Sequence, residues 1–436
     1  MKRVFTVLLA LVTGIVLMTS CQTAEAAPHS ATPGTYTVTA HGWYGDFPVS
    51  VTVSGTAITD ISYEGAQEAA YLGGKALPLM VERIKAANTA GVDTVAGATM
   101  SSAAFKAAVV EALKQAKASA AFTAAPPKAA SRAETLETDL LVIGSGAAGF
   151  SAAIAAKEGG VQNVLIIEKN DLIGGSTITS AGIVYAALDE DDIPGMVDYY
   201  MGRANQQADR TMLQFFAENS LGTISFLQDH GWVTPFAGSA GTAPESRARF
   251  SGGFSGQDLI NPLEASAKSL GIVIKTDVTA TGLIQANGAI VGAKAVNRAG
   301  NISYTINAKA VMLATGGYDA SQEMLAQYNP RSAGDITLSN KGNTGDGIRM
   351  GVAVGAATVF KGGIIGFEQV DWSLAGGDTG NAMAKTNYIR EDGSLVDLNV
   401  GSYAMNATDY PIVHTALLRA RDEGATKFFT LLDSTP

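Results

Sequence analysis

Two groups of residues in the 436-residue chain have types and spacings that could do chemistry. The first is Gly97-Ala98-Thr99, which lies just ahead of a stretch with helical apolar spacing. The second is Gly144-Ser145-Gly146-Ala147-Ala148-Gly149, followed after about 20 residues by Glu168. A helix N-terminus presents free amide hydrogens and a positive dipole end, and both stabilise a phosphate group. Both groups could therefore hold a phosphate-containing ligand.

Thr99 is the candidate for a covalent bond. Gly97 and Ala98 leave little side-chain bulk around its hydroxyl, so a phosphoester could form there. The alternative is structural, because a Ser or Thr ahead of a helix is most often an N-cap that accepts a backbone N–H bond. Local chemistry alone favours the N-cap.

The glycine-rich run belongs to a predicted βαβ unit. A buried-type strand over Asp139–Ile143 precedes it, a small-residue helix over 146–159 contains its end, and Val164–Ile167 is a second strand. The order strand, glycines, helix, strand and acidic residue is the fingerprint of a dinucleotide-binding domain. A chance glycine turn is the alternative, and this order disfavours it.

Each fingerprint residue has a predicted role. Gly144 and Gly146 would let backbone amides approach a pyrophosphate, with Ala148 beside them in the first turn of the helix. Gly149 would allow close packing of helix against strand, and Glu168 would accept hydrogen bonds from an adenosine ribose.

The other segments predict the domain organisation. Residues 34–117 combine β-branched alternation with two stretches of helical spacing, which indicates a small α+β module. Residues 118–137, with Pro126-Pro127 and few large apolar side chains, are typical of a linker. An α/β domain of the doubly wound type is predicted over 138–360.

The N-terminus has the form of an export signal. A basic start precedes the apolar run Val4–Met18, which is too short for a membrane-spanning helix. Leu17 to Cys21 resembles the lipobox of bacterial lipoproteins, which implies a signal over 1–21, lipidation of Cys21 and a tether over 22–33. The alternative is an ordinary signal cleaved after Ala24-Glu25-Ala26. We expect a protein lipid-anchored at the outer face of the cytoplasmic membrane.

Charge and cysteine content exclude several classes. The net charge is −10 and Lys and Arg do not cluster, which argues against affinity for nucleic acid. A single cysteine cannot form a disulfide within the chain or supply the Cys-x-x-Cys-His motif of a c-type haem. No metal site is predicted.

Residues 34–117 resemble the FMN-binding domain found in the sodium-pumping NADH:quinone reductase and in exported reductases. The resemblance rests on Leu77-Pro78, on Val92-Asp93 and on Gly97-Ala98-Thr99-x-Ser-Ser. It implies FMN joined to Thr99 by a phosphoester bond that a flavin transferase makes after export. Ala96 stands where the family commonly has Ser or Thr, and the hydroxyl to be modified is retained.

Residues 139 to about 357 resemble the FAD domain of the fumarate reductase and flavocytochrome c family, which includes urocanate reductases. The resemblance implies non-covalent FAD and a cap domain, incomplete here, over 361–436. Beyond the fingerprint, the positions implied to contact FAD are Lys169, Gly174, Gly175, Ser176, Thr177, Ala181, Gly182, Val278, Ala314, Thr315, Gly316, Gly317 and Asp346.

The catalytic positions depart from this family. Gln369-Val370-Asp371 has an acid where the family has a His that helps bind a substrate carboxylate, and Pro411 stands in place of the proton-donating Arg. Asp371 would repel a carboxylate, which disfavours fumarate. Tyr410 is a candidate general acid if its neighbours lower its pKa, although a packed aromatic is the commoner role for such a residue.

Three other residues could contribute to a substrate site. His414 could titrate near neutral pH, although a satisfied histidine is the commoner case. Arg247 and Arg249 could hold an acidic group by bidentate hydrogen bonds, or they could be solvated loop charges.

The resemblance implies a flavin-dependent oxidoreductase acting on CH–CH groups. Such an enzyme would reduce the C=C bond of a small α,β-unsaturated acid or carbonyl compound, with electrons passing from a membrane donor through covalent FMN to FAD. The family continues beyond the strand predicted over Phe428–Leu432, so we expect a truncated member or half of a split gene. The alternative is a surface electron carrier whose FAD domain is not catalytic. A protein that has lost both flavins is disfavoured by the intact motifs.

Overall fold

The computed structural model describes residues 28–42, 45–70, 72–180, 182–187, 189–203, 206, 208–233, 248–250, 255–330, 333–334, 340–358, 387–390, 423–424 and 428–431. The chain divides into two compact units. The first contains 1–67, 78–93 and 103–126, and the second contains 68–77, 94–102 and 127–436.

The first unit is built on a three-stranded antiparallel sheet in the order β1 (Gly34–His41), β2 (Asp46–Val53), β3 (Ile58–Tyr63). Every second residue of β2 is apolar and at most 2% exposed, from Phe47 to Val53. The intervening positions are Pro48, Ser50 and Thr52. This period of two leaves one face of the sheet buried and the other in solvent.

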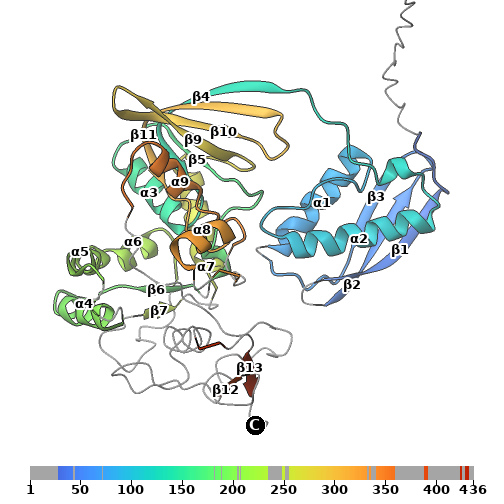
Figure 1. The fold of residues 1–436 in the computed structure, drawn as a ribbon. Coiled ribbons are helices and arrows are strands. Elements are labelled where there is room, and N and C mark those ends of the chain that lie inside the picture. The colour runs from blue at the N-terminus through green and yellow to red at the C-terminus, as the bar shows by residue number, and fades with distance from the viewer. Residues whose placement is uncertain are drawn as a thin grey trace, which may run out of the picture. The chain divides into compact units, whose positions relative to one another are not determined.

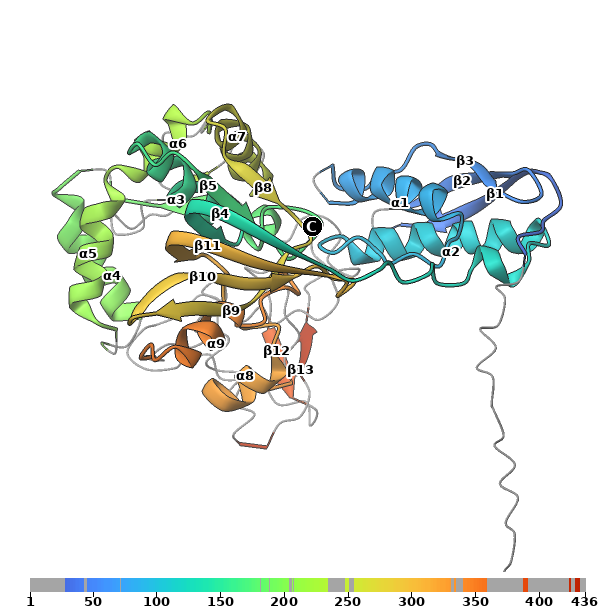
Figure 2. The same cartoon turned by 90° about the horizontal axis from the view of Figure 1, so that it is seen from above.

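Two helices run beside this sheet (Figures 1 and 2), α1 (Gly73–Ala87) and α2 (Thr99–Gln115). In α2, Phe105, Val109 and Leu113 recur every four residues and are at most 1% exposed. This spacing places them on one helical face. The predicted α+β module is therefore present. The helical spacing in the sequence covers only 77–87 and 102–116, so each helix begins three or four residues earlier than that pattern indicates.

The predicted linker 118–137 is structured at both ends. A short 3-10 helix, η1 (Ala120–Phe122), buries Phe122 completely, and the backbone oxygen of Phe122 accepts a hydrogen bond from Ala90 N at 2.8 Å. At the other end, strand β4 already begins at Arg132. The segment between these two elements is thus much shorter than the sequence suggested.

The second unit contains a six-stranded mixed sheet in the order β8-β5-β4-β11-β10-β9. The first four strands are parallel to one another, and β10 pairs antiparallel with both β11 and β9. The bounds are β4 (Arg132–Ile143), β5 (Val164–Ile167), β8 (Val273–Lys275), β9 (Thr279–Ala286), β10 (Ala289–Val296) and β11 (Ile302–Leu313).

Both faces of this sheet are covered. Val142 and Ile166 pack against α3 (Ala147–Glu158) and α7 (Gln257–Ser269). Their neighbours Leu141 and Ile167 face a second core that includes Met350 of α9 (Asp346–Ala353). Figure 2 shows α3 and α7 on one side of the sheet and α9 on the other. Strands buried on both faces and covered by helices confirm the predicted α/β fold.

Smaller elements surround this sheet. α4 (Asp192–Arg203), α5 (Arg210–Ser220) and α6 (Thr223–Asp229) follow η2 (Thr177–Thr179), and α4 and α5 share an apolar core. The remaining elements are β6 (Ile183–Tyr185), β7 (Ala248–Phe250) and α8 (Gln322–Tyr328). Among the described helices, none is both long and apolar enough to cross a membrane.

Only fragments of the predicted cap domain, 361–436, are described. β12 (Asn387–Arg390) pairs antiparallel with β13 (Phe428–Leu431), which occupies the strand predicted near the C-terminus. The signal at 1–21, including Cys21, and the first half of the tether, 22–27, lie outside the described residues.

Candidate cofactor site

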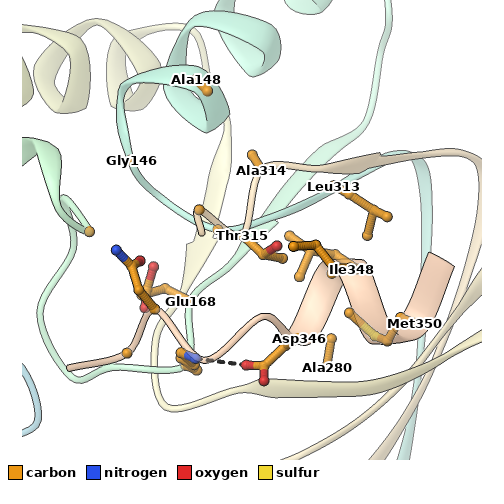
Figure 3. A pocket seen from close by; sticks show the side chains of 18 of the residues that line it. Gly146, Ala148, Glu168, Ala280, Leu313, Ala314, Thr315, Asp346, Ile348 and Met350 are labelled. Atoms are coloured by element: carbon orange, nitrogen blue, oxygen red, sulfur yellow. Dashed lines mark hydrogen bonds and ion pairs between the residues drawn. The ribbon is translucent and has the colours of Figure 1, made fainter. Parts of the chain in front are cut away.

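A cavity of about 580 Å³ lies at the carboxyl ends of the parallel strands β4, β5 and β11 (Figure 3). The loops after these three strands line it. From β4 the chain crosses through α3 to β5 on one side, while β11 lies on the other side of β4. The strand order therefore reverses at the cavity, which is where open α/β sheets bind their ligands.

Most positions predicted to contact a dinucleotide line this cavity. They are Gly144, Gly146, Ala148, Glu168, Lys169, Gly175, Ser176, Thr177, Val278, Ala314, Thr315, Gly316 and Asp346. Gly149, Gly174, Gly182 and Gly317 are described but are not among the lining residues. Ala181 lies outside the described residues.

The fingerprint positions require glycine for different physical reasons. Gly144 has φ +111°, and a Cβ there would stand 2.2 Å from the backbone oxygen of Ala314. A Cβ on Gly149 would stand 2.0 Å from the backbone oxygen of Gly144. Both positions therefore need glycine to fold, and Gly149 allows the close packing of helix and strand that the sequence predicted.

Gly146 is the exception. Its φ is −72°, and the nearest atom to an added Cβ would be Thr177 Oγ1 at 3.6 Å, an ordinary contact. The fold itself has room for a side chain at this position, which lies at the start of α3 in the cavity wall. Its absence leaves the backbone open to a ligand, as close approach of a pyrophosphate requires. The residues present thus fit a dinucleotide.

The start of α3 is the part of the cavity wall that could hold a phosphate group. Gly146, Ala147 and Ala148 all line the cavity, and Figure 3 shows Gly146 and Ala148 in the turn where the helix begins. Ala147 N donates to Thr177 Oγ1 at 3.2 Å, which joins the second glycine-rich loop to this turn. The first amides of a helix have no partner inside the helix, and its dipole favours a negative charge there.

Glu168 is 5% exposed at the end of β5. Its Oε2 accepts hydrogen bonds from Ser145 N at 3.1 Å and Ser145 Oγ at 2.7 Å, and its Oε1 accepts one from Asn170 N at 2.9 Å. These bonds use three of the roughly four acceptor positions of a carboxylate. They fix the side chain and leave capacity for a ribose hydroxyl.

An ion pair joins two walls of the cavity. Lys169 Nζ lies 2.7 Å from Asp346 Oδ2 and donates to Thr344 Oγ1 at 2.9 Å. The side chains of Lys169 and Asp346 are each 25% exposed. The dashed line that ends at Asp346 in Figure 3 marks this pair. The sequence placed both residues at the cofactor but did not predict that they contact each other.

Sequence reasoning missed several polar residues of the site. Asn170, Asn340 and Asn343 line the cavity, and Asn343 Nδ2 donates to Ser176 Oγ at 2.8 Å and to Asp319 Oδ1 at 2.9 Å. Isolated asparagines in loops have no periodicity. The one available indication for Asn343 was its position three residues before Asp346, which the resemblance implied to contact FAD.

Thr99 is the first residue of α2 and is exposed. Its hydroxyl has no hydrogen-bond partner among the described residues. Thr99 therefore does not make the N-cap hydrogen bond that was the structural alternative. The two serines that follow are engaged elsewhere: Ser101 Oγ donates to Glu68 Oε2 at 2.5 Å, and Ser102 Oγ donates to Ala98 O at 2.7 Å. Of these three hydroxyls, that of Thr99 is the one open to modification.

The predicted substrate residues cannot be placed in the same way. Most of them lie outside the described residues, namely Arg247, the segment 369–371, Tyr410, Pro411 and His414. Arg249 is described only as part of β7. The proton donor stays a prediction.

Comparisons with known proteins agree with this geometry. The family model described as FAD binding domain matches residues 139–432, and the one described as FMN-binding domain matches residues 42–114. These matches confirm the resemblances drawn from the two motifs.

Two curated relatives are similar over most of the chain. A urocanate reductase of Eggerthella lenta is 31% identical over 337 residues, which cover 74% of this chain and 55% of the relative. An NADH:fumarate oxidoreductase of Klebsiella pneumoniae is 30% identical over 343 residues, which cover 76% and 36%. The chain thus spans about half the length, or less, of these relatives.

A solved structure supports the fold. The 3-ketosteroid Δ1-dehydrogenase of Sterolibacterium denitrificans matches with a TM-score of 0.54 at 15% identity, covering 68% of this chain and 69% of that one. At this identity the likeness concerns the fold alone. With the fingerprint at the switch point of the sheet and the family model spanning more than half of the residues, the chain belongs to the FAD-binding domain family and carries an FMN-binding domain ahead of it.

Proposed function

We propose that the chain is the flavin-carrying part of an oxidoreductase that reduces the C=C bond of an α,β-unsaturated acid or carbonyl compound. The observation that carries the proposal is the cavity at the carboxyl edge of the sheet, lined by an intact dinucleotide fingerprint. The two relatives are named for urocanate and fumarate, which are both unsaturated acids. When bound, FAD supplies the hydride that such a reduction needs.

The residues of the cavity bind and orient the cofactor. The open backbone at Gly146 and the first turn of α3 would hold the pyrophosphate, and Glu168 would hold the ribose. The pair of Lys169 and Asp346 fixes the loop after β5 against the start of α9. These contacts place the cofactor and do not select a substrate.

We propose that electrons enter through FMN joined to Thr99 by a phosphoester bond, made by a flavin transferase. The exposed hydroxyl at the start of α2, without a partner among the described residues, supports this attachment. The engagement of Ser101 and Ser102 within the protein supports the choice of Thr99. From there electrons would pass to the FAD cavity.

We propose export and anchoring at the outer face of the cytoplasmic membrane, through a lipid on Cys21. The support is the basic start, the apolar run and the lone cysteine that follows it. This location would bring the FMN-binding domain to an electron donor in the membrane.

The substrate proposal rests on residue types. Asp371 stands where the family has a carboxylate-binding His, so we propose a substrate other than a small dicarboxylate, with Tyr410 as the proton donor. A urocanate-like or cinnamate-like acid, or an unsaturated carbonyl compound, has fewer carboxylates to be repelled.

The test begins with the flavins of the exported protein. After denaturation, mass spectrometry should find the mass of FMN on a peptide containing Thr99 and FAD in the released fraction. A panel of unsaturated acids is then supplied with an artificial one-electron donor. Turnover of at least one acid is the expected result. Both flavins without any turnover would favour the electron-carrier alternative, and absence of both flavins would contradict either function.

A further inference from the structure

Arg298 lies in the turn between β10 and β11 and is not among the residues that line the cavity. Two asparagines that are 8% and 9% exposed, Asn297 and Asn301, build this turn. Asn297 Oδ1 accepts from Asn301 N at 3.0 Å and from Ile302 N at 2.9 Å, and Asn297 Nδ2 donates to Asn301 Oδ1 at 2.8 Å. Because buried polar groups are satisfied in this way, the turn presents Arg298 in a defined position.

Arg298 contacts acidic residues on two different loops. One guanidinium nitrogen donates to Asp171 Oδ2 at 2.8 Å, and the backbone N of Arg298 donates to Asp277 Oδ1 at 3.0 Å. Its Nε lies 4.0 Å from the same oxygen of Asp277. Asp171 follows β5 and its side chain is 5% exposed, whereas Asp277 follows β8. One arginine therefore ties the loop after β5 to the loop after β8.

These two loops form one wall of the cavity. Asp277 N donates to Asn170 O at 3.0 Å, and Val278 N donates to Glu168 O at 2.9 Å. Glu168, Asn170 and Val278 all line the cavity. Asp277 has φ +58°, a conformation that L residues rarely adopt, and its bond to Arg298 N stabilises it locally. The direction in which Val278 enters the cavity thus depends on the contact between Asp277 and Arg298.

We propose that Arg298 is a positioning residue for the adenosine half of FAD. It holds Glu168 and Val278 at the spacing that a ribose and an adenine ring require, and does so from outside the cavity. Binding of the adenosine end of FAD therefore depends partly on the turn between β10 and β11, which lies outside the dinucleotide fingerprint. This inference rests on FAD as the ligand of the cavity and is independent of the substrate.

The experiment compares Arg298→Met with the unchanged chain, both freed of FAD. The dissociation constants of FAD and of ADP are measured by calorimetry, because ADP carries the adenosine and pyrophosphate without the flavin. We expect both constants to rise roughly tenfold. Arg298→Lys keeps the charge but not the planar guanidinium group. Its dissociation constants should therefore lie between those of Arg298→Met and those of the unchanged chain. Lys309→Met removes the 2.7 Å ion pair with Asp139 in the same sheet and should leave both constants unchanged.

Unchanged binding of FAD and ADP by Arg298→Met would overturn the inference. A lower melting temperature of the FAD-free protein beside those unchanged constants would mark a purely structural role. If Arg298→Met does not fold, Asp277→Gly tests the other contact of this turn, since glycine accepts the positive φ but loses the bond from the backbone N of Arg298, which Arg298→Met retains. Asp277→Gly should weaken the binding of ADP by a similar factor, and unchanged ADP binding overturns the inference. If the unchanged chain binds neither ligand, the FAD assignment itself fails.

Discussion

Lys169 and Asp346 form an ion pair of 2.7 Å that links the loop after β5 to the first turn of α9 across the cofactor cavity. The sequence distance between them is large, so only the folded sheet brings them together. Their side chains are each 25% exposed, and Thr344 Oγ1 completes the cluster by bonding to both. A pair of this kind sets the width of the cavity and also places one cation and one anion beside an anionic cofactor.

This relationship predicts unequal effects of removing the two charges. Lys169→Met removes the cation 2.7 Å from Asp346 and leaves that carboxylate only the longer ion pair with Arg349, of 3.6 Å. Because less positive charge then faces the anionic cofactor, FAD should bind roughly tenfold more weakly, a loss of about 1.4 kcal/mol. Asp346→Asn frees Lys169 to face the phosphates and should cost less. Fluorescence titration of FAD at low and high salt checks the order. Equal losses for the two variants would show that the pair acts through shape alone.

The two helix-start glycines predict opposite phenotypes for the same substitution. Gly146→Ala adds a methyl group that meets only ordinary contacts in the protein, so stability should change by less than about 1 kcal/mol while FAD binding weakens strongly. Gly149→Ala places a methyl group 2.0 Å from a backbone oxygen and should lower the free energy of unfolding by about 1–3 kcal/mol. Thermal melts of the FAD-free variants and FAD titrations separate the two. A destabilised Gly146→Ala would contradict the open-backbone account.

Thr99 should be the attachment site, and its neighbours supply the controls. Thr99→Ala should abolish the covalent flavin, whereas Thr99→Ser keeps a hydroxyl and should retain it. Ser101→Ala removes the bond to Glu68 and should leave the flavin in place. Mass spectrometry of the denatured proteins shows whether each of the three variants carries covalent flavin. Covalent flavin that persists in Thr99→Ala would move the attachment to another hydroxyl.

Asp139 predicts an acid-sensitive contribution to stability. The hydrogen bond from Lys309 and then the backbone N–H of Asn163 lower the pKa of Asp139 below its ordinary value. Because the folded pKa is the lower one, this stabilisation is fully present above the ordinary Asp pKa of about 3.9 and is lost as the pH falls through the folded value. Asp139→Asn should therefore flatten the fall in unfolding free energy below about pH 4. If chemical denaturation shows the same fall of unfolding free energy with acid in Asp139→Asn as in the unchanged chain, the acid-sensitive stabilisation does not come from Asp139.

The sequence predicted the central strands better than their extensions. β5 has the predicted bounds because all four of its residues are apolar and buried. β4 and β11 begin at Arg132 and Ile302, whereas the apolar runs that predict these strands begin only at 139 and 310. The first half of β4 is mostly polar, and the first half of β11 alternates polar and apolar residues. Those halves become strands by pairing with each other over a long sequence distance, which a local pattern does not show.

The same physical difference applies to the site. The fingerprint glycines were predictable because their backbone geometry constrains the residue type at each position. Asn343 and Arg298 were not, because a single polar residue in a loop has no local pattern that indicates its partner. Their roles depend on which loops the sheet brings together at its carboxyl edge.

The cavity at the carboxyl edge of the sheet is proposed to hold the FAD that reduces a C=C bond. The most direct measurement reduces the flavins of the purified protein without oxygen, adds an unsaturated acid such as urocanate, and follows the flavin absorbance in a stopped-flow instrument. The account predicts rapid reoxidation by at least one unsaturated acid, none by its saturated counterpart, and loss of this response in Gly146→Ala. Reoxidation that is the same in Gly146→Ala, with FAD absent from that variant, would contradict it.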